Sequence, residues 1–150
     1  MLVPLNHLHS ALRWVTLALL LLTIFSSLRG MPSKTYTAGD RKLALFTMIV
    51  LHLQLVIGLG LYFISPSVKA ALADPEKMAH ATSRFWAVEH LVGMVLAILI
   101  ATVGYMRAKK TTDGWPRHRT ILFYYLLSLI IILATIPWPF REVGAGRGWF

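Results

Sequence analysis

Three histidines lie inside long apolar stretches of this 150-residue sequence: His9, His52 and His90. A titratable side chain in a hydrocarbon environment is costly, so it usually faces a partner, a cavity or a cofactor. Neutral imidazole is also one of the axial ligands with which proteins hold haem iron. The three positions therefore offer a choice between a haem site and ordinary hydrogen bonding between helices.

The composition is that of a membrane protein. Hydrophobic residues make up 57% of the chain and charged residues only 14%, which sets it apart from soluble domains. The absence of cysteine excludes disulfides, iron–sulfur clusters, thiolate zinc sites and covalently attached c-type haem. The net charge of +9 is typical of basic loops beside membrane spans. Nothing resembles a nucleic-acid-binding module, so we expect no nucleic acid partner.

The elements that must position the histidines are four apolar segments, each near the ~20 residues that a helix needs to cross a hydrocarbon core. Glycine, proline and charged residues separate them. We expect an all-α integral membrane four-helix bundle of up-down-up-down topology that forms a single transmembrane domain. The expected spans are residues 5–28, 43–64, 85–106 and 121–138 of the domain 1–150.

The connections between these spans differ in length and character. Residues 29–42 and 107–120 are expected to be polar or basic loops. The connection between the second and third spans contains Asp74-Pro75, and Asp is a favoured N-cap while Pro suits the first helical position. We therefore expect a short interfacial helix there. The chain closes with a glycine-rich stretch, residues 144–148.

An even number of spans places both termini at one end of the bundle, which we call end A; the first and third connections lie at end B. Six of the 15 Lys and Arg residues are at end A: Arg13, Lys69, Lys77, Arg84, Arg141 and Arg147. Nine are at end B: Arg29, Lys34, Arg41, Lys42, Arg107, Lys109, Lys110, Arg117 and Arg119. Cytoplasmic loops carry the excess of Lys and Arg. We expect end B in the cytoplasm of a bacterial inner membrane, with both termini periplasmic.

Depth in the membrane decides which histidines can meet. The first and third spans both start at end A, and His9 and His90 each lie within the first turns of their span. At ~1.5 Å of rise per residue they share a depth, whereas His52 lies roughly 10 Å or more deeper. His9 and His90 are the expected axial pair. His52 is the alternative ligand if the second helix is shifted, and His7 is a fallback near the end A surface.

The surroundings of the pair suggest further cofactor contacts. Arg13 and Glu89 share a depth, so we expect them to form an ion pair, or Arg13 to meet a haem propionate. Arg84 lies near the same surface and offers a second donor to propionates. Helical spacing from His90 reaches Gly93 and Ala97, where small side chains leave room for a macrocycle. Ordinary helix–helix packing is the other explanation for these small residues.

Several of these stretches resemble a known family: residues 9–14 (HSALRW), 42–47 (KLALFT), 52–55 (HLQL), 88–90 (VEH) and 136–138 (IPW). They look like the small four-helix membrane proteins of Bacteroidota-type bacteria that are labelled as b-type cytochromes, and the similarity covers nearly the whole chain. The resemblance implies haem b. More distantly, the His-bearing first helix and the WxxxH of the third resemble the membrane protoporphyrinogen oxidase family. The spacing around His90 departs from that family.

Three functions follow from these observations. The first is a membrane cytochrome that transfers electrons through one bis-histidine haem b, with other membrane or periplasmic redox subunits, or a quinone, as partners. The second is a haem-free accessory or assembly subunit whose histidines only bond helices together. The third is a haem-associated membrane oxidoreductase of the protoporphyrinogen oxidase type. No hydrolase, kinase or P-loop motif is present, and electron transfer is favoured over a stand-alone enzyme.

Overall fold

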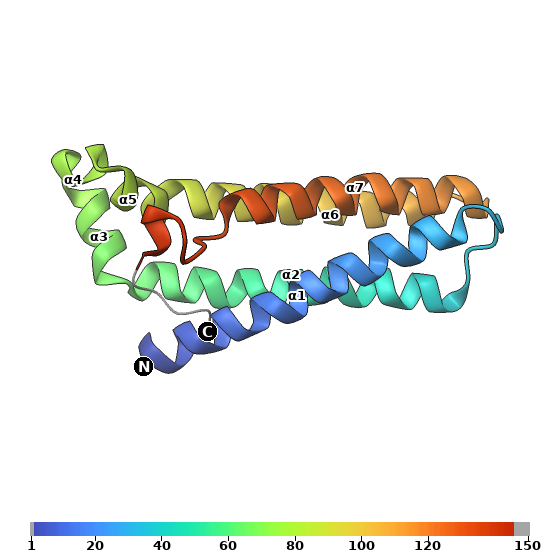
Figure 1. The fold of residues 1–150 in the computed structure, drawn as a ribbon, viewed down its shortest axis with the longest axis horizontal. Helices are drawn as coiled ribbons and strands as arrows, with labels where there is room; N and C mark the ends of the chain where they lie inside the picture. The colour runs from blue at the N-terminus through green and yellow to red at the C-terminus, as the bar shows by residue number, and fades with distance from the viewer. Residues whose placement is uncertain (1, 146–150) are drawn as a thin grey trace.

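The computed structural model describes residues 2–145, and all regular structure within them is helical (Figure 1). Four helical segments are long and apolar enough to cross a membrane. Their principal helices are α1 (Leu2–Gly30), α2 (Ala38–Ile64), α6 (His90–Lys110) and α7 (Gly114–Thr135). The chain is therefore a multi-pass membrane protein built as an all-α helix bundle, which confirms the fold class predicted from the sequence.

The four long helices alternate in direction, and their order around the bundle is α1, α2, α6, α7. Each packs against its two neighbours in that order, so α1 and α6 face each other diagonally across the interior. Both of these helices run from end A to end B (Figure 1). This arrangement places the beginnings of α1 and α6 at the same end of the molecule, as the depth argument requires.

Short helices connect α2 to α6 at end A, where they turn away from the long bundle axis (Figure 1). These are α3 (Pro66–Ala73), α4 (Pro75–Ala79) and α5 (Ala81–Arg84). The Asp74 side chain accepts a hydrogen bond of 3.0 Å from the Glu76 backbone N–H at the start of α4. The predicted N-cap and the short helix that follows it are confirmed.

The first connection at end B is shorter than predicted. α2 starts at Ala38 because Thr37 and Asp40 form a capping box: Asp40 N–H donates to Thr37 Oγ1 at 3.1 Å, and Thr37 N–H donates to Asp40 Oδ2 at 2.8 Å. Such reciprocal bonds satisfy two backbone donors at a helix start. The prediction of a loop through residue 42 was wrong, because that cap lies among charged residues that resemble a loop in composition.

The third connection is also shorter than predicted, since α6 continues to Lys110 and α7 already begins at Gly114. Pro116 lies in the first turn of α7, where its missing N–H costs nothing. At the other end, α7 stops at Thr135 instead of residue 138. Ile136 precedes a proline and is extended (φ −68°, ψ 133°), the conformation that a following proline imposes.

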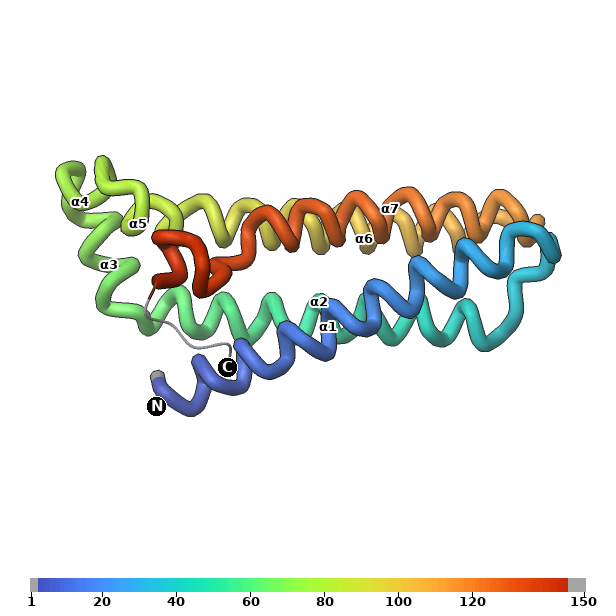
Figure 2. The backbone as a smooth tube through the Cα atoms, in the orientation of Figure 1, coloured from blue at the N-terminus to red at the C-terminus, as the bar shows by residue number. Residues whose placement is uncertain are grey.

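After α7 the chain folds back at end A, between the start of α1 and the start of α6, and ends its described part in the 3₁₀ turn η2 (Glu142–Gly144) (Figure 2). Trp86 Nε1 donates to Val143 O at 3.2 Å and holds this segment to the bundle. Residues 146–148 of the predicted glycine-rich tail, including Arg147, lie outside the described residues.

Some polar side chains inside the bundle form hydrogen bonds between helices. A row of polar residues on α1 is buried at Thr16, Thr23 and Ser27. Thr23 Oγ1 lies 2.7 Å from Thr47 Oγ1 of α2, and Tyr125 of α7 donates its hydroxyl to Ala44 O at 2.7 Å. In a membrane such contacts hold helices together, because the lipid offers no alternative partner.

The row of small residues on α6 packs against α7. Gly93, Ala97, Ala101 and Gly104 are all buried. A Cβ added at Gly104 would overlap the Tyr124 Cβ, and one added at Gly93 would overlap the Thr135 methyl group. The helix-packing explanation of these residues therefore holds, and the row does not face the interior space beside His90.

This packing predicts that Gly104→Ala destabilises the protein by about 1–3 kcal/mol through overpacking. Gly60→Ala is the matched control, because a Cβ there meets nothing within 4 Å and alanine favours a helix over glycine. Thermal unfolding of both variants in detergent should show a loss for Gly104→Ala alone. An equal loss at Gly60 would contradict the close α6–α7 contact.

Candidate functional site

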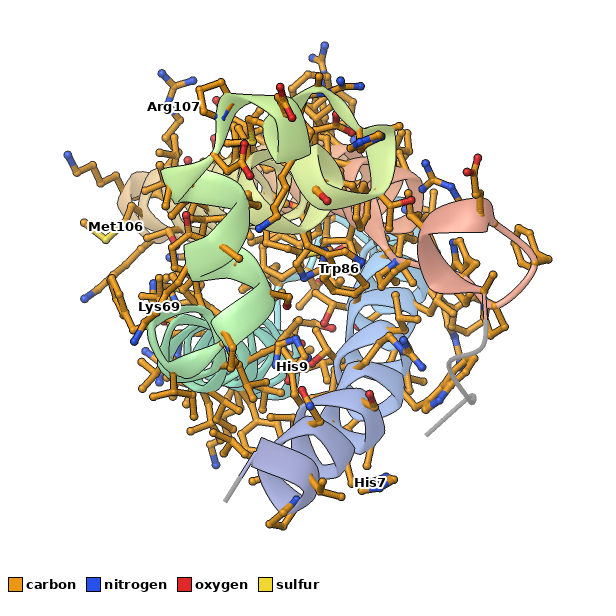
Figure 3. All side chains as sticks on the ribbon, turned by 90° about the vertical axis from the view of Figure 1, so that its left-hand side faces the viewer. His7, His9, Lys69, Trp86, Met106 and Arg107 are labelled. Carbon is orange, nitrogen blue, oxygen red and sulfur yellow. The ribbon has the colours of Figure 1, made fainter. Side chains whose placement is uncertain are left out.

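A cavity of about 350 Å³ lies at end A between the long helices. Most of its lining is apolar, from residues such as Leu51, Met94 and Ile132. Several polar side chains in its wall could bind a ligand through nitrogen or oxygen atoms. They include His9, Arg13, Gln54, Tyr62, Trp86 and His90. Viewed from this end, His9 and Trp86 point toward the space enclosed by the helices (Figure 3). An apolar cavity with a few converging polar groups is the usual form of a cofactor site.

His9 and His90 meet across this cavity. Their ring centroids are 6.5 Å apart, and the two planes are inclined by 76°. The pair comes from α1 and α6, the two diagonal helices that start at end A. Depth along parallel helices thus correctly singled out the two histidines that the structure brings together.

The orientation of His90 is fixed by its neighbours. Its Nδ1 lies 2.9 Å from the Thr135 carbonyl oxygen, which can only accept, so Nδ1 carries the proton of this hydrogen bond. The Phe85 and Trp86 rings lie 5.9 and 5.7 Å from the imidazole. A histidine held through Nδ1 by a backbone carbonyl is arranged as metal-ligating histidines usually are.

The backbone immediately before His90 forms one turn of π-helix, η1 (Phe85–Glu89). The His90 N–H closes this turn on the Phe85 carbonyl, and Tyr62 of α2 donates its hydroxyl to the Ala87 carbonyl at 2.9 Å. π-turns within helices are rare and occur frequently at functional sites. Here the turn sets the rotation of His90 about the α6 axis.

His9 is held by α2. The Gln54 amide donates to the His9 carbonyl at 2.9 Å, and a Cβ added at Gly58 would lie 3.1 Å from His9 Cε1, so the ring lies directly over the glycine. Two atoms of this group, His9 Nδ1 and Gln54 Oε1, are buried without a hydrogen-bond partner among the described residues. Buried polar atoms in this state are uncommon and indicate an additional ligand or water.

The alternative histidines do not reach the cavity. His52 is exposed, and its Nδ1 and Nε2 lie 2.8 Å from Met48 O and 3.5 Å from Thr102 Oγ1. Because Thr102 follows His90 by twelve residues of helix, this site is roughly 18 Å deeper along α6. His7 points outward from α1 (Figure 3). Gly93 and Ala97 are outside the cavity lining as well.

The predicted ion pair between Arg13 and Glu89 was wrong. Glu89 instead accepts a hydrogen bond of 2.8 Å from Arg84 Nε, and both side chains are about half exposed. The physical reason is the π-turn, in which residues five apart stack along the axis, so the carboxylate faces its own segment. Arg13 lines the cavity, with its guanidinium 5.3 Å from the centre of the Trp14 ring.

Some residues of this site could not be predicted from the sequence. No sequence motif predicts the contacts of the Thr135 carbonyl and the Tyr62 hydroxyl, and none predicts the π-turn. Gln54 and Gly58 were visible as a polar residue and a glycine within an apolar span.

No group of three His, Asp or Glu side chains that could hold a metal ion occurs within residues 2–145.

Comparisons with known proteins add little to the conclusion that the chain is a membrane protein. No family model matches the chain, and no solved structure matches it. A protein described as a probable peptidoglycan glycosyltransferase FtsW, from Polynucleobacter necessarius, is 30% identical over 105 residues. That alignment covers 70% of this chain but only 23% of the relative, so the chain spans less than a quarter of that protein's length.

The observed charge contacts predict which variants are coupled. Arg84→Gln and Glu89→Gln should each change the unfolding free energy by less than about 1 kcal/mol, because the pair is exposed. The double variant should cost no more than one single change, since both remove the same interaction. Arg13→Gln combined with Glu89→Gln should be additive. Coupling between Arg13 and Glu89 in thermal unfolding would contradict this geometry.

Proposed function

We propose that this protein is a membrane b-type cytochrome that holds one haem b between His9 and His90 and transfers electrons. One observation carries the proposal: two imidazoles on diagonal helices face each other, 6.5 Å between ring centroids, across a largely apolar cavity. Helix bundles commonly build cofactor sites from side chains on facing helices. Paired axial histidines with apolar walls are the ligand set that b-type haem uses.

The residues of the cavity fit such a group. The 6.5 Å between the two ring centroids brings the imidazoles of both helices to the same cavity, where they could hold one metal-containing group. The cavity of about 350 Å³ falls within the ~300–1,000 Å³ of small-molecule and cofactor sites. The Nδ1 of His9 is buried without a hydrogen-bond partner among residues 2–145. The Nδ1 of His90 is held by a backbone carbonyl, as in many metal-ligating histidines.

Each side chain then has a definite role. His9 and His90 would hold the haem iron through ring nitrogens, the Thr135 carbonyl fixes the orientation of the His90 ring, and Gln54 fixes the α1 backbone at His9. Arg13 supplies positive charge to the cavity wall for a propionate. A bound haem would supply reversible one-electron chemistry, while the protein sets its orientation and potential. Because the cavity lies at end A, the redox partner, a membrane or periplasmic subunit or a quinone, is expected at that end.

We also propose that end B faces the cytoplasm of a bacterial inner membrane, so that the cavity lies on the periplasmic side. The support is the bias of nine basic residues at end B against six at end A, one of which, Arg147, lies outside the described residues. Short basic loops are retained in the cytoplasm during insertion.

Reporter fusions test this orientation. Alkaline phosphatase inserted in the 111–113 connection should be inactive, because that enzyme requires the periplasm, and an insertion in α4 should be active. A cytoplasmic fluorescent reporter should give the reverse pattern. Phosphatase activity from the 111–113 insertion would overturn the orientation and leave the helix count untouched.

Histidine variants test the haem site. We expect His90→Ala to abolish stoichiometric haem, because it removes the imidazole that its neighbours hold most firmly. His9→Ala should do the same or leave a five-coordinate, high-spin iron. Absorption and electron paramagnetic resonance spectra of the purified proteins distinguish these results.

His52→Ala is the matched control, since it removes an imidazole from the same bundle outside the cavity. It should retain haem with an unchanged spectrum and potential. Haem lost in His52→Ala but kept in His9→Ala would preserve a cytochrome and reject this ligand pair.

A further inference from the structure

Charge is distributed unevenly between the two ends of the bundle. The nine basic residues of end B stand against two acids, Asp40 and Asp113, which gives a net charge of 9 − 2 = +7. One of these acids, Asp40, is engaged in the capping box and also accepts a hydrogen bond from Ser26. The five basic residues described at end A stand against four acids, a net charge of +1. End B is therefore a strongly cationic surface at the edge of an apolar bundle.

Five side chains of end B converge on one small opening between α2, α6, α7 and the first connection. We call them the end B cluster: Tyr36, Arg41, Tyr105, Lys109 and Arg117. The opening has a volume of about 10 Å³, enough for one oxygen-sized group. The cluster thus brings three cations and two phenols together from two stretches of the sequence, residues 36–41 and 105–117.

Arg117 anchors the cluster. Its Nε donates to the Ala108 carbonyl at 2.9 Å, its NH2 group reaches the Lys109 carbonyl at 3.5 Å, and its guanidinium lies 5.1 Å from the centre of the Tyr36 ring. These bonds cap the last carbonyls of α6. Arg117 is therefore held in place and fixes the position of Tyr36 beneath it.

The remaining donors of the cluster are unused. The side chains of Arg41 and Lys109 are exposed, and neither forms a hydrogen bond or ion pair with another residue of the described chain. The hydroxyls of Tyr36 and Tyr105 likewise form no hydrogen bond with residues 2–145. Burial, and then the charge of Asp40, raise the pKa of Tyr36 to about 12. This phenol stays protonated at neutral pH and keeps its O–H donor.

Apolar side chains lie within two helical turns of these cations, toward the middle of the bundle. Phe46 of α2 and Val103 and Met106 of α6 are 54%, 43% and 52% exposed. Met106 and Arg107 project outward from the bundle (Figure 3). A ligand that fits both the end B cluster and these apolar residues has two parts. An anionic head lies beside the cations, and hydrocarbon chains lie along the exposed apolar side chains.

We propose that the end B cluster binds the phosphate group of an anionic phospholipid. Arg41 and Lys109 supply the charge, Tyr36 and Tyr105 supply neutral donors, and one phosphoryl oxygen enters the small opening. Basic pockets between membrane helices bind acidic headgroups in this way. A free phosphate or a nucleotide would leave the exposed apolar surface beneath the cluster without a role. The proposal is independent of the haem site at the opposite end.

Native mass spectrometry of the detergent-purified protein, titrated with phosphatidylglycerol and separately with phosphatidylcholine, measures the affinity for each lipid. We expect preferential binding of phosphatidylglycerol. Each cation near a headgroup contributes about 1 kcal/mol, so the double variant Arg41→Gln/Lys109→Gln should bind phosphatidylglycerol about 30-fold more weakly. Circular dichroism verifies that the helices of the variant are intact.

Two further variants decide the result. Lys69→Gln/Lys77→Gln removes the same charge from end A and should leave the affinity unchanged. Arg41→Lys/Lys109→Arg retains the charge and should retain most of the affinity, even if the neutral variant folds poorly. Equal binding of both lipids by the wild type, or an equal loss in the end A variant, would overturn the proposal. Displacement of bound lipid by an RNA oligonucleotide would assign the cluster to nucleic acid and also overturn it.

Discussion

The structure depends on one constraint: a polar group inside a membrane-length bundle needs a partner within the protein or a bound ligand. Most such groups meet this requirement through contacts between helices, as the Thr23–Thr47 and Tyr125–Ala44 hydrogen bonds show. At end A the requirement is not fully met, because His9 Nδ1 and Gln54 Oε1 are buried without partners among the described residues. The cavity beside them is where the protein itself leaves room for a ligand.

The four helices and the pairing of His9 with His90 were predictable because each follows from a strong signal. Apolar length fixes the spans, and rise per residue fixes which side chains of parallel helices share a depth. The helix starts at Ala38 and Gly114 were missed, because both lie among charged residues that resemble a loop in composition. At Ala38 a capping box begins the helix. The predicted ion pair between Arg13 and Glu89 was wrong, because a single π-turn directs Glu89 toward Arg84. No sequence pattern predicts such a turn.

The two ends of the bundle have separate chemistry. End A combines a largely apolar cavity with imidazoles and is nearly balanced in charge, while end B is cationic and has only a small opening. Helices α1 and α6 join them, so one pair of helices carries the two imidazoles at one end and basic residues at the other. Firm attachment of end B to acidic lipids would hold the cavity at a constant depth near the opposite surface.

The central claim is that His9 and His90 share one haem, and the haem content of the wild-type protein tests it most directly. The full chain, expressed with ample iron and purified in mild detergent, would be measured by absorption before and after reduction with dithionite. We predict a Soret band, sharp α and β bands on reduction, and one haem per chain. A folded helical protein that shows no Soret band under these conditions would contradict the account.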